Sequence, residues 1–94
     1  MKPRVSYDEG KNLILQQTRG IGFEDVIKAI EHKHILADLK HHDQHKYPHQ
    51  RVLVIKIKNY AYAVPYVIDT KKDTIFLKTI YPSRVLTKKY LKHL

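Results

Sequence analysis

The sequence predicts an α+β fold in which helices pack on a single, mostly antiparallel sheet. Three observations support this prediction. Residues 23–31 carry a complete helical stripe of apolar side chains, and three segments between residues 51 and 81 alternate with the two-residue period of β-strands. A basic segment with helical spacing follows at the C-terminus. The expected order is therefore two helices, about four strands and a terminal helix.

Length and charge limit what the chain can be. Its 94 residues suit one domain, residues 1–94, with one modest core. Lys and Arg number 18 against 9 Asp and Glu, and the net charge of +9 points to nucleic acid, an acidic protein or an anionic membrane as partner. Cysteine is absent, and we find no signal peptide and no apolar run of the roughly 18 residues that cross a bilayer. We expect a soluble cytoplasmic protein.

The first helix is expected from Glu9 to Gln17. Asp8 is a suitable N-cap, and Leu13 and Ile14 are expected to face inward. The segment 18–20 ends in Gly20, which adopts the left-handed cap conformation at low cost and should terminate the helix.

The second helix is expected from Phe23 to Glu31. Its apolar stripe has the spacing i, i+3, i+4 and i+7 and consists of Phe23, Val26, Ile27 and Ile30. Acidic residues suit the positive N-terminal end of this helix, and basic residues follow its C-terminal end.

The strands are expected in the second half of the chain. We predict strands at Ile35–Leu39, Arg51–Lys58, Tyr60–Ile68 and Thr74–Tyr81, a polar loop at His41–Gln50, and turns at Lys58-Asn59 and Asp69–Asp73. Pro65 implies a bulge or an unpaired position in the third of these strands. The last strand is expected to run through Tyr81-Pro82 directly into the basic terminal helix.

The terminal helix combines a cationic stripe with an apolar face. Arg84, Lys88 and Lys92 are four residues apart, as are Leu86, Tyr90 and Leu94, which can dock on the sheet. These cations have two interpretations: they either solvate the helix or bind an anion.

Several short motifs resemble the BrnT toxins of bacterial type II toxin–antitoxin pairs. The motifs are Asp8-x-x-Lys11, Gly20-Ile21-x-Phe23-Glu24-Asp25, Arg51 at the start of an apolar strand, and Arg84-x-x-Thr87-Lys88-Lys89. The resemblance spans nearly the whole chain. It implies a RelE-like fold, metal-independent endoribonuclease activity without a cofactor, and a cognate antitoxin that carries a DNA-binding domain.

The residues offer candidates for that chemistry. RNA cleavage without metal needs a base for the 2′-hydroxyl, cations for the phosphorane and an acid for the leaving oxygen. We consider Arg84 as a phosphate clamp, with Lys78, Tyr81, His32 and His34 as further catalytic candidates. The predicted RNA-binding residues are Arg51, Lys56, Arg84, Lys88, Lys89 and Lys92.

Two other residue groups have competing interpretations. His41, His45 and His49 would line up on one face of a helix and bind zinc or nickel, but Pro48 and the lack of companion ligands favour a solvated loop. The aromatic group Tyr60, Tyr62 and Tyr66 either stacks nucleobases or forms the inward face of a sheet.

Three function classes therefore remain open. The first is a toxin ribonuclease that inhibits translation and assembles with an antitoxin. The second is a non-catalytic module that binds RNA or DNA. The third is an interaction protein that uses its basic surface to bind an acidic partner.

Overall fold

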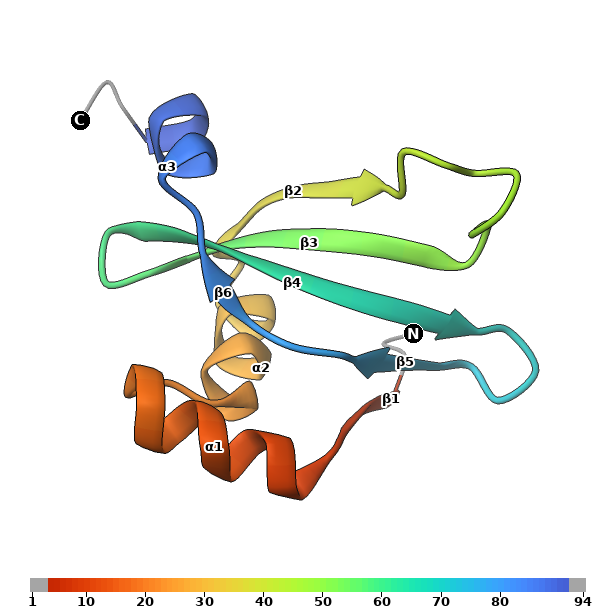
Figure 1. Cartoon of the computed structure of the whole chain (residues 1–94), viewed down its shortest axis with the longest axis horizontal. Coiled ribbons are helices and arrows are strands. Elements are labelled where there is room, and N and C mark those ends of the chain that lie inside the picture. The colour runs from red at the N-terminus through yellow and green to blue at the C-terminus, as the bar shows by residue number, and fades with distance from the viewer. Residues whose placement is uncertain (1–3, 92–94) are drawn as a thin grey trace.

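The computed structural model of the protein describes residues 4–91 and has an α+β architecture, as predicted. In chain order the elements are β1 (Arg4–Tyr7), α1 (Glu9–Arg19), α2 (Phe23–Glu31), β2 (Ile35–Lys40), β3 (Gln50–Ile57), β4 (Tyr60–Asp69), β5 (Thr74–Leu77), β6 (Tyr81–Pro82) and α3 (Arg84–Leu91). They form one six-stranded sheet in the order β1-β5-β4-β3-β2, with β6 pairing β4 beyond the end of β5. Helices α1 and α2 lie on one side of the sheet and α3 on the other (Figure 1).

Helix α1 begins and ends close to the residues that its capping pattern indicates. The side chain of Asp8 accepts hydrogen bonds from the backbone of Gly10 at 2.8 Å and of Lys11 at 3.3 Å, and Gly20 closes the helix with φ of 71°. The inward-facing residues were predicted wrongly, however. Leu13 and Ile14 are 56% and 55% exposed.

The buried residues of α1 are Asn12 and Leu15. Asn12 also links the two N-terminal helices by hydrogen bonds. Asn12 Oδ1 accepts a hydrogen bond from the backbone N–H of Phe23 at 2.7 Å, and its Nδ2 donates to both carboxylate oxygens of Glu24 at 3.0 and 3.1 Å. These bonds hold the first turn of α2 against α1, and the bond from Asn12 lowers the pKa of Glu24.

The core lies between α1, α2 and one face of the sheet, which we call the helix-pair face. Helix α2 spans the predicted residues and buries Phe23, Val26 and Ala29 in this core, whereas Ile27 and Ile30 of the predicted stripe are half-buried. The core residues are Leu15, Ile21, Phe23, Val26, Ala29, Leu53, Ile55, Val64, Tyr66, Leu77 and Ile80. Burial of this apolar surface is the main stabilising contribution to the fold.

Helix α3 covers part of the opposite face, which we call the α3 face. Val54, Ala61 and Ala63 point to this side and are fully or almost fully buried. The two alanines leave room for the helix to approach the backbone of β4. Both faces of the sheet are therefore apolar at this end.

Strands β3 and β4 form the hairpin that the sequence predicts. Lys58 and Asn59 form its two-residue turn, with φ of 52° and 65°. Two successive positive φ values are typical of the turn whose twist matches that of paired strands.

The predicted strand from Thr74 to Tyr81 is wrong as a single element, because it breaks after Leu77 and resumes at Tyr81. The break lies opposite Pro65 in β4. The carbonyl of Pro65 accepts a hydrogen bond from Lys78 N at 2.8 Å, so the nitrogen of Pro65, which has no hydrogen to donate, faces the same gap. Proline thus occupies the position at which pairing stops.

The sequence patterns also missed strand β1. Its four residues pair in parallel with β5, with Val5 opposite Ile75 and Tyr7 opposite Leu77. A four-residue segment offers too few alternating positions to be distinguished from a loop.

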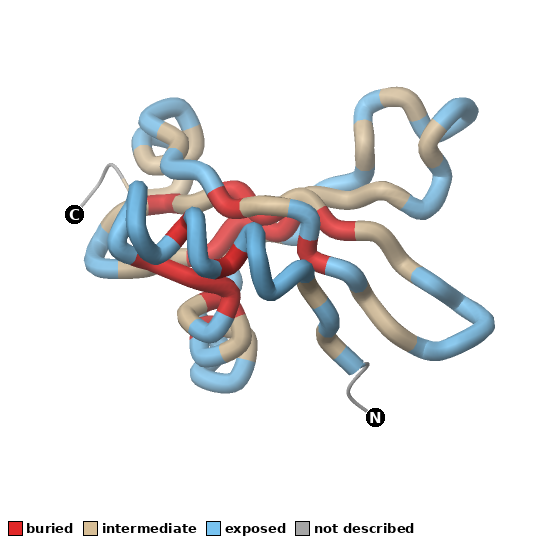
Figure 2. The backbone as a smooth tube through the Cα atoms, turned by 60° about the horizontal axis from the view of Figure 1, so that its bottom comes forward, coloured by how far each residue is buried: buried red, intermediate tan, exposed pale blue. Residues whose placement is uncertain are grey.

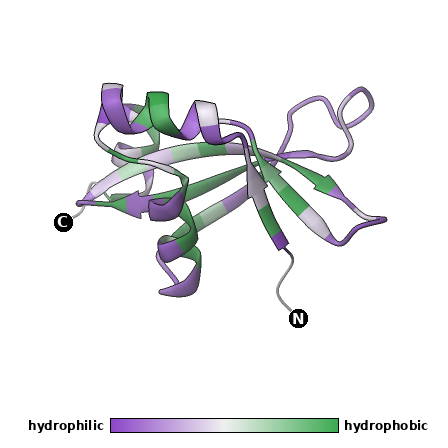
Figure 3. Ribbon diagram, turned by 90° about the horizontal axis from the view of Figure 1, so that it is seen from below, coloured by the Kyte–Doolittle hydropathy of each residue, from purple (hydrophilic) through white to green (hydrophobic). Residues whose placement is uncertain are grey.

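The end of the sheet far from the β3–β4 hairpin extends beyond all three helices. Figure 2 shows that buried residues concentrate where the helices cover the sheet, while the β2–β3 loop and the β4–β5 turn are largely exposed. Figure 3 shows hydrophobic residues along the strands and hydrophilic ones in these connections. Within residues 4–91, no helix is long and apolar enough to cross a membrane.

Candidate nucleic-acid interface

A groove crosses the part of the α3 face that α3 leaves uncovered. We call it the basic groove; it has a volume of about 410 Å³ and is lined by Leu39, Lys40, His41, His42, Gln50, Arg51, Val52, Pro65 and Tyr81. Its lining includes basic side chains and no carboxylate. Leu39 is 37% and Tyr81 42% exposed, so the floor presents apolar and aromatic surface to solvent. Aromatic surface beside cations is the combination that binds single-stranded nucleic acid.

Three of the predicted catalytic residues follow one another along β4 on this side. Lys78 is joined to Pro65 by its backbone, Tyr81 lies opposite Ala63, and Ser83, which precedes Arg84, donates from its backbone to Ala61 at 3.0 Å. Positions two residues apart on a strand are separated by roughly 6.6 Å. Lys78 and Arg84 therefore flank Tyr81 along β4, although neither belongs to the lining of the groove.

The start of α3 is anchored firmly to the sheet. Ser83 Oγ accepts a hydrogen bond from the backbone of Leu86 at 3.1 Å, and Thr87 Oγ1 accepts one from the backbone of Ala61 at 2.9 Å. Thr87 Oγ1 also donates to the carbonyl of Ser83 at 2.7 Å. Arg84 thus projects from the first turn of a fixed helix, where backbone N–H groups add to its affinity for anions.

The predicted RNA-binding lysines of α3 are only partly described. Lys88 and Lys89 are exposed, and Lys89 Nζ lies 5.4 Å from the ring centroid of Tyr90. Lys92 lies outside the described residues. Exposure leaves Lys88 and Lys89 able to contact an anion and is equally typical of a solvated helix face.

His41 and His42 line the basic groove, although the sequence suggested only a solvated loop or a metal site for this segment. Their rings are stacked with centroids 4.4 Å apart, and Nδ1 of His41 accepts a hydrogen bond from the backbone of Asp43 at 3.0 Å. The groove brings them to the same cleft as Tyr81 because Leu39 pairs with Val52, and Val52 with Pro65. The proximity of these histidines to Tyr81 depends on how the strands pair and cannot be inferred from spacing along the sequence.

The remaining histidine candidates lie elsewhere. His32 and His34, with ring centroids 6.1 Å apart, line a separate crevice of about 220 Å³ together with Lys56. We call this site the hairpin crevice; its lining is Asp25, Lys28, Ala29, His32, His34, Lys56, Ile57 and Lys58. Of the predicted site residues, Arg51 and Tyr81 therefore line the basic groove and His32, His34 and Lys56 line the hairpin crevice, whereas Lys78, Arg84, Lys88 and Lys89 line neither.

Arg51 differs from the other candidates because its charge is already paired. Its Nε donates to Asp38 Oδ1 at 3.1 Å and its Nη2 to the carbonyl of Asp38 at 3.1 Å, and the hydrogen bond to Asp38 raises the pKa of Arg51. The hydroxyl of Tyr66 donates to the same Asp38 oxygen at 2.7 Å. Burial is the larger cause and this hydrogen bond the next, and together they raise the pKa of Tyr66 to about 12.

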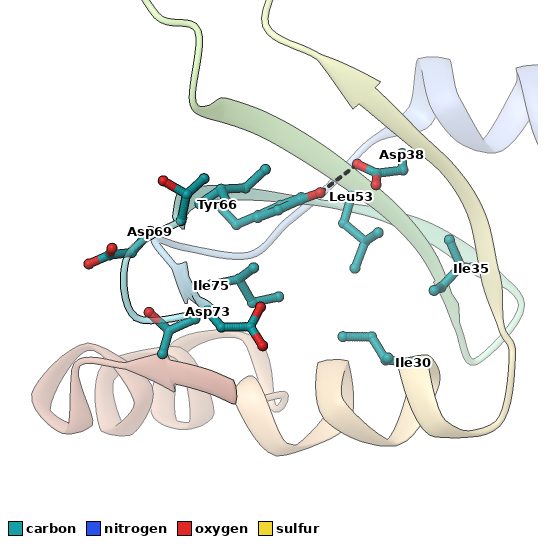
Figure 4. A pocket seen from close by; sticks show the side chains of 11 residues that line it. Ile30, Ile35, Asp38, Leu53, Tyr66, Asp69, Asp73 and Ile75 are labelled. Atoms are coloured by element: carbon teal, nitrogen blue, oxygen red, sulfur yellow. Dashed lines mark hydrogen bonds between the residues drawn. The ribbon is translucent and has the colours of Figure 1, made fainter. Parts of the chain in front are cut away.

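Asp38 and Tyr66 belong to a larger cleft on the helix-pair face, the acidic cleft, of about 480 Å³. It is lined by Ile30, Ile35, Asp38, Leu53, Tyr66, Ile68, Asp69, Thr70, Asp73, Thr74 and Ile75. Figure 4 shows Tyr66 reaching Asp38 at one end, with Asp69 and Asp73 toward the other. A lining with three carboxylates and no basic residue is unsuited to RNA phosphates.

The tyrosines of β4 support the inward-facing interpretation. Tyr66 belongs to the core, and Tyr62 packs against it and meets Tyr60 edge to face at 6.0 Å. Their rings are therefore occupied by packing and intramolecular contacts.

The loop histidines do not assemble into a metal site. Within residues 4–91, no group of three or more His, Cys, Asp or Glu side chains is arranged to hold a metal ion. His45 and His49 are exposed in the β2–β3 loop, which is not helical, so the helical alignment with His41 does not form.

In comparisons with known proteins, no family model, no curated protein and no solved structure matched the chain.

Proposed function

We propose that this protein is the toxin of a bacterial type II toxin–antitoxin system: a metal-independent endoribonuclease of RelE-like fold that inhibits translation in the cytoplasm. The observation that carries the proposal is the basic groove. Its exposed Tyr81 lies between Lys78 and the helix that begins at Arg84, on a chain of net charge +9. The motifs that resemble BrnT toxins lead to the same function.

The groove and the residues that flank Tyr81 offer a candidate for each role that RNA cleavage needs. Arg84 and Lys78, which lie on either side of Tyr81 in the chain and outside the groove lining, neutralise the charge that develops on the phosphorane, and the first turn of α3 adds N–H donors. Tyr81 and an imidazole, His41 or His42, transfer the protons because they line the same cleft. The internal 2′-hydroxyl is the nucleophile, so the expected product carries a 2′,3′-cyclic phosphate.

A cognate antitoxin with a DNA-binding domain completes the proposal. The basic groove combines exposed apolar side chains with basic residues and no carboxylate in its lining, a surface that an acidic amphipathic segment complements. Such a segment would neutralise the toxin by covering the groove.

One observation favours a second candidate, a non-catalytic RNA-binding module. Tyr81 and Phe76 are each 42% exposed on the α3 face, and exposed aromatic residues beside cations bind RNA in proteins that perform no chemistry. Binding without cleavage distinguishes this candidate from the first.

The test combines growth with RNA chemistry. Inducible expression without a partner should arrest growth, and Arg84→Ala should relieve the arrest while the purified variant stays folded, because Arg84 is an exposed residue. The matched control is Lys72→Ala, which removes an exposed cation from the β4–β5 turn.

In vitro, a defined RNA should be cleaved equally with and without EDTA and yield 2′,3′-cyclic phosphate ends. Complete loss of cleavage on chelation would contradict metal independence. Tight binding of intact RNA with no cleavage under any condition would select the binding module instead.

A further inference from the structure

The hairpin crevice is lined by five basic residues from three parts of the chain. Lys28 and His32 come from the end of α2, His34 precedes β2, and Lys56 and Lys58 come from the β3–β4 hairpin. The positive φ of Lys58, 52°, belongs to the tight turn that brings this lysine beside the crevice. The fold therefore creates a concentration of positive charge that sequence spacing does not reveal.

None of these five basic residues forms a salt bridge within the described residues. The salt bridge found within residues 4–91 joins Arg51 and Asp38, at the other end of the sheet. Asp25 is the carboxylate of the crevice lining, and its Oδ2 accepts a hydrogen bond from the backbone of Gly22 at 2.9 Å. Mutual repulsion of like charges around one concavity favours binding of an external anion.

The helix dipole accounts for only part of this arrangement. Lys28 and His32 lie at the C-terminal end of α2, where a positive charge is favourable without any ligand. His34, Lys56 and Lys58 lie beyond the helix in the chain, and strand pairing and the hairpin turn bring them to the same crevice.

A continuous row of backbone contacts connects the crevice with the start of α3. Ser83 donates to Ala61, Ala61 lies opposite Lys56, and Lys56 N donates to the carbonyl of His34 at 3.0 Å. Three strand spacings amount to roughly 14 Å. The separation is too large for His34 and Arg84 to act on one phosphate group, yet small enough for one RNA strand to contact both.

We propose that the hairpin crevice is a phosphate-binding subsite for the same single-stranded RNA whose scissile phosphate lies in the basic groove. The inference rests on the proposed function and extends it. Lys56, between the two sites in the row, contacts the backbone on the way, and His32 and His34 bind phosphate rather than transfer protons. Because α2 lies on the helix-pair face and the basic groove on the α3 face, the RNA path passes around the edge of the sheet at its hairpin end.

The test compares two double variants that each remove two positive charges. Lys28→Gln/Lys58→Asn alters the crevice, and asparagine tolerates the positive φ at position 58. The control, Lys71→Gln/Lys72→Gln, alters the exposed β4–β5 turn. Binding to a dinucleotide and to a single-stranded RNA of about a dozen nucleotides is measured over a range of salt concentrations.

The crevice variant should bind the longer RNA about tenfold more weakly than wild type. The slope of log K against log salt concentration should become shallower by about 1.4, because each lost phosphate contact contributes about 0.7 to this slope. Its dinucleotide affinity and the behaviour of the control should match wild type. If wild type binds the longer RNA and the crevice variant equals the control, the subsite is overturned while the proposed function stands. If the wild-type protein binds no RNA, both the subsite and the proposed function are overturned.

A second measurement separates RNA from free phosphate. Inorganic phosphate is titrated while the imidazole NMR signals of His32 and His34 are followed, with His45 and His49 as internal references. Shifts confined to the crevice, together with the loss of affinity for longer RNA, support the subsite. Shifts without any effect on RNA binding identify a site for free phosphate only and overturn it.

Discussion

The basic groove and the acidic cleft occupy opposite faces of the same part of the sheet. Residues that are adjacent in the sequence line different cavities: Leu39, Val52 and Pro65 line the groove, whereas their neighbours Asp38, Leu53 and Tyr66 line the cleft. The two-residue period of strands thus sends neighbouring residues to the two sides of one layer. The comparison shows that a net charge of +9 describes the chain and not each of its surfaces.

The packing of neighbouring residues offers the strongest test of this difference. Leu53 is 5% exposed and belongs to the core, whereas its neighbour Val52 is half-buried on the groove side. Leu53→Ala should lower the free energy of unfolding by about 3 kcal/mol and Val52→Ala by about 1 kcal/mol, as urea denaturation will measure. Equal losses would mean that the groove face is as well covered as the core.

The two tyrosines offer a matched pair for function. Tyr81→Phe should lower the rate of RNA cleavage about a hundredfold with little change in RNA affinity, because only the proton-transferring hydroxyl is removed. Tyr66→Phe, on the opposite face, should leave the cleavage rate unchanged. Single-turnover kinetics and filter binding measure the two quantities. Equal activity of Tyr81→Phe and wild type would remove this hydroxyl from the mechanism.

Ionisation of Tyr66 in the acidic cleft should make the folded protein less stable at alkaline pH. Because the pKa of Tyr66 is raised to about 12 in the folded protein, the stabilisation is complete below the unfolded pKa of about 10 and is lost as pH rises from 10 toward 12. The loss should be on the order of 2 kcal/mol. Urea midpoints across this range should fall more steeply for wild type than for Tyr66→Phe, which itself costs about 1 kcal/mol at neutral pH. Parallel pH profiles would contradict this prediction.

Arg51 should give the smallest effect because Asp38 compensates its charge. Arg51→Gln is expected to change RNA affinity little and to lower the free energy of unfolding by about 1 kcal/mol or less. Lys78→Gln, which removes an exposed lysine, should weaken RNA binding and make the slope of log K against log salt concentration shallower by about 0.7. If Arg51→Gln weakens binding as much as Lys78→Gln does, Arg51 contacts RNA despite its partner.

Local signals predicted the local parts of the fold. Asp8 and Gly20 marked the ends of α1, the stripe from Phe23 marked α2, and Lys58-Asn59 marked the hairpin turn. Each signal acts through neighbouring residues, so sequence spacing contains it.

The parts that were missed depend on long-range pairing. Strand β1 exists because β5, about seventy residues later, supplies its partner, and the break in the last predicted strand follows from Pro65 in a neighbouring strand. The groove likewise depends on register, which places His41 in the same cleft as Tyr81. Composition predicted that cations would bind an anion, but not which cations would be neighbours.

The contact between α1 and α2 makes two distant positions mutationally dependent on each other. A Cβ atom at Gly22 would lie 2.6 Å from Asn12 Oδ1, the oxygen that the backbone N–H of Phe23 holds in place. A side chain at position 22 is therefore accommodated only where position 12 carries a smaller residue and Gln16, whose Cγ and Nε2 would each lie 3.0 Å away, moves aside. In divergent descendants of this chain, a side chain at position 22 should therefore occur only together with a substitution at position 12.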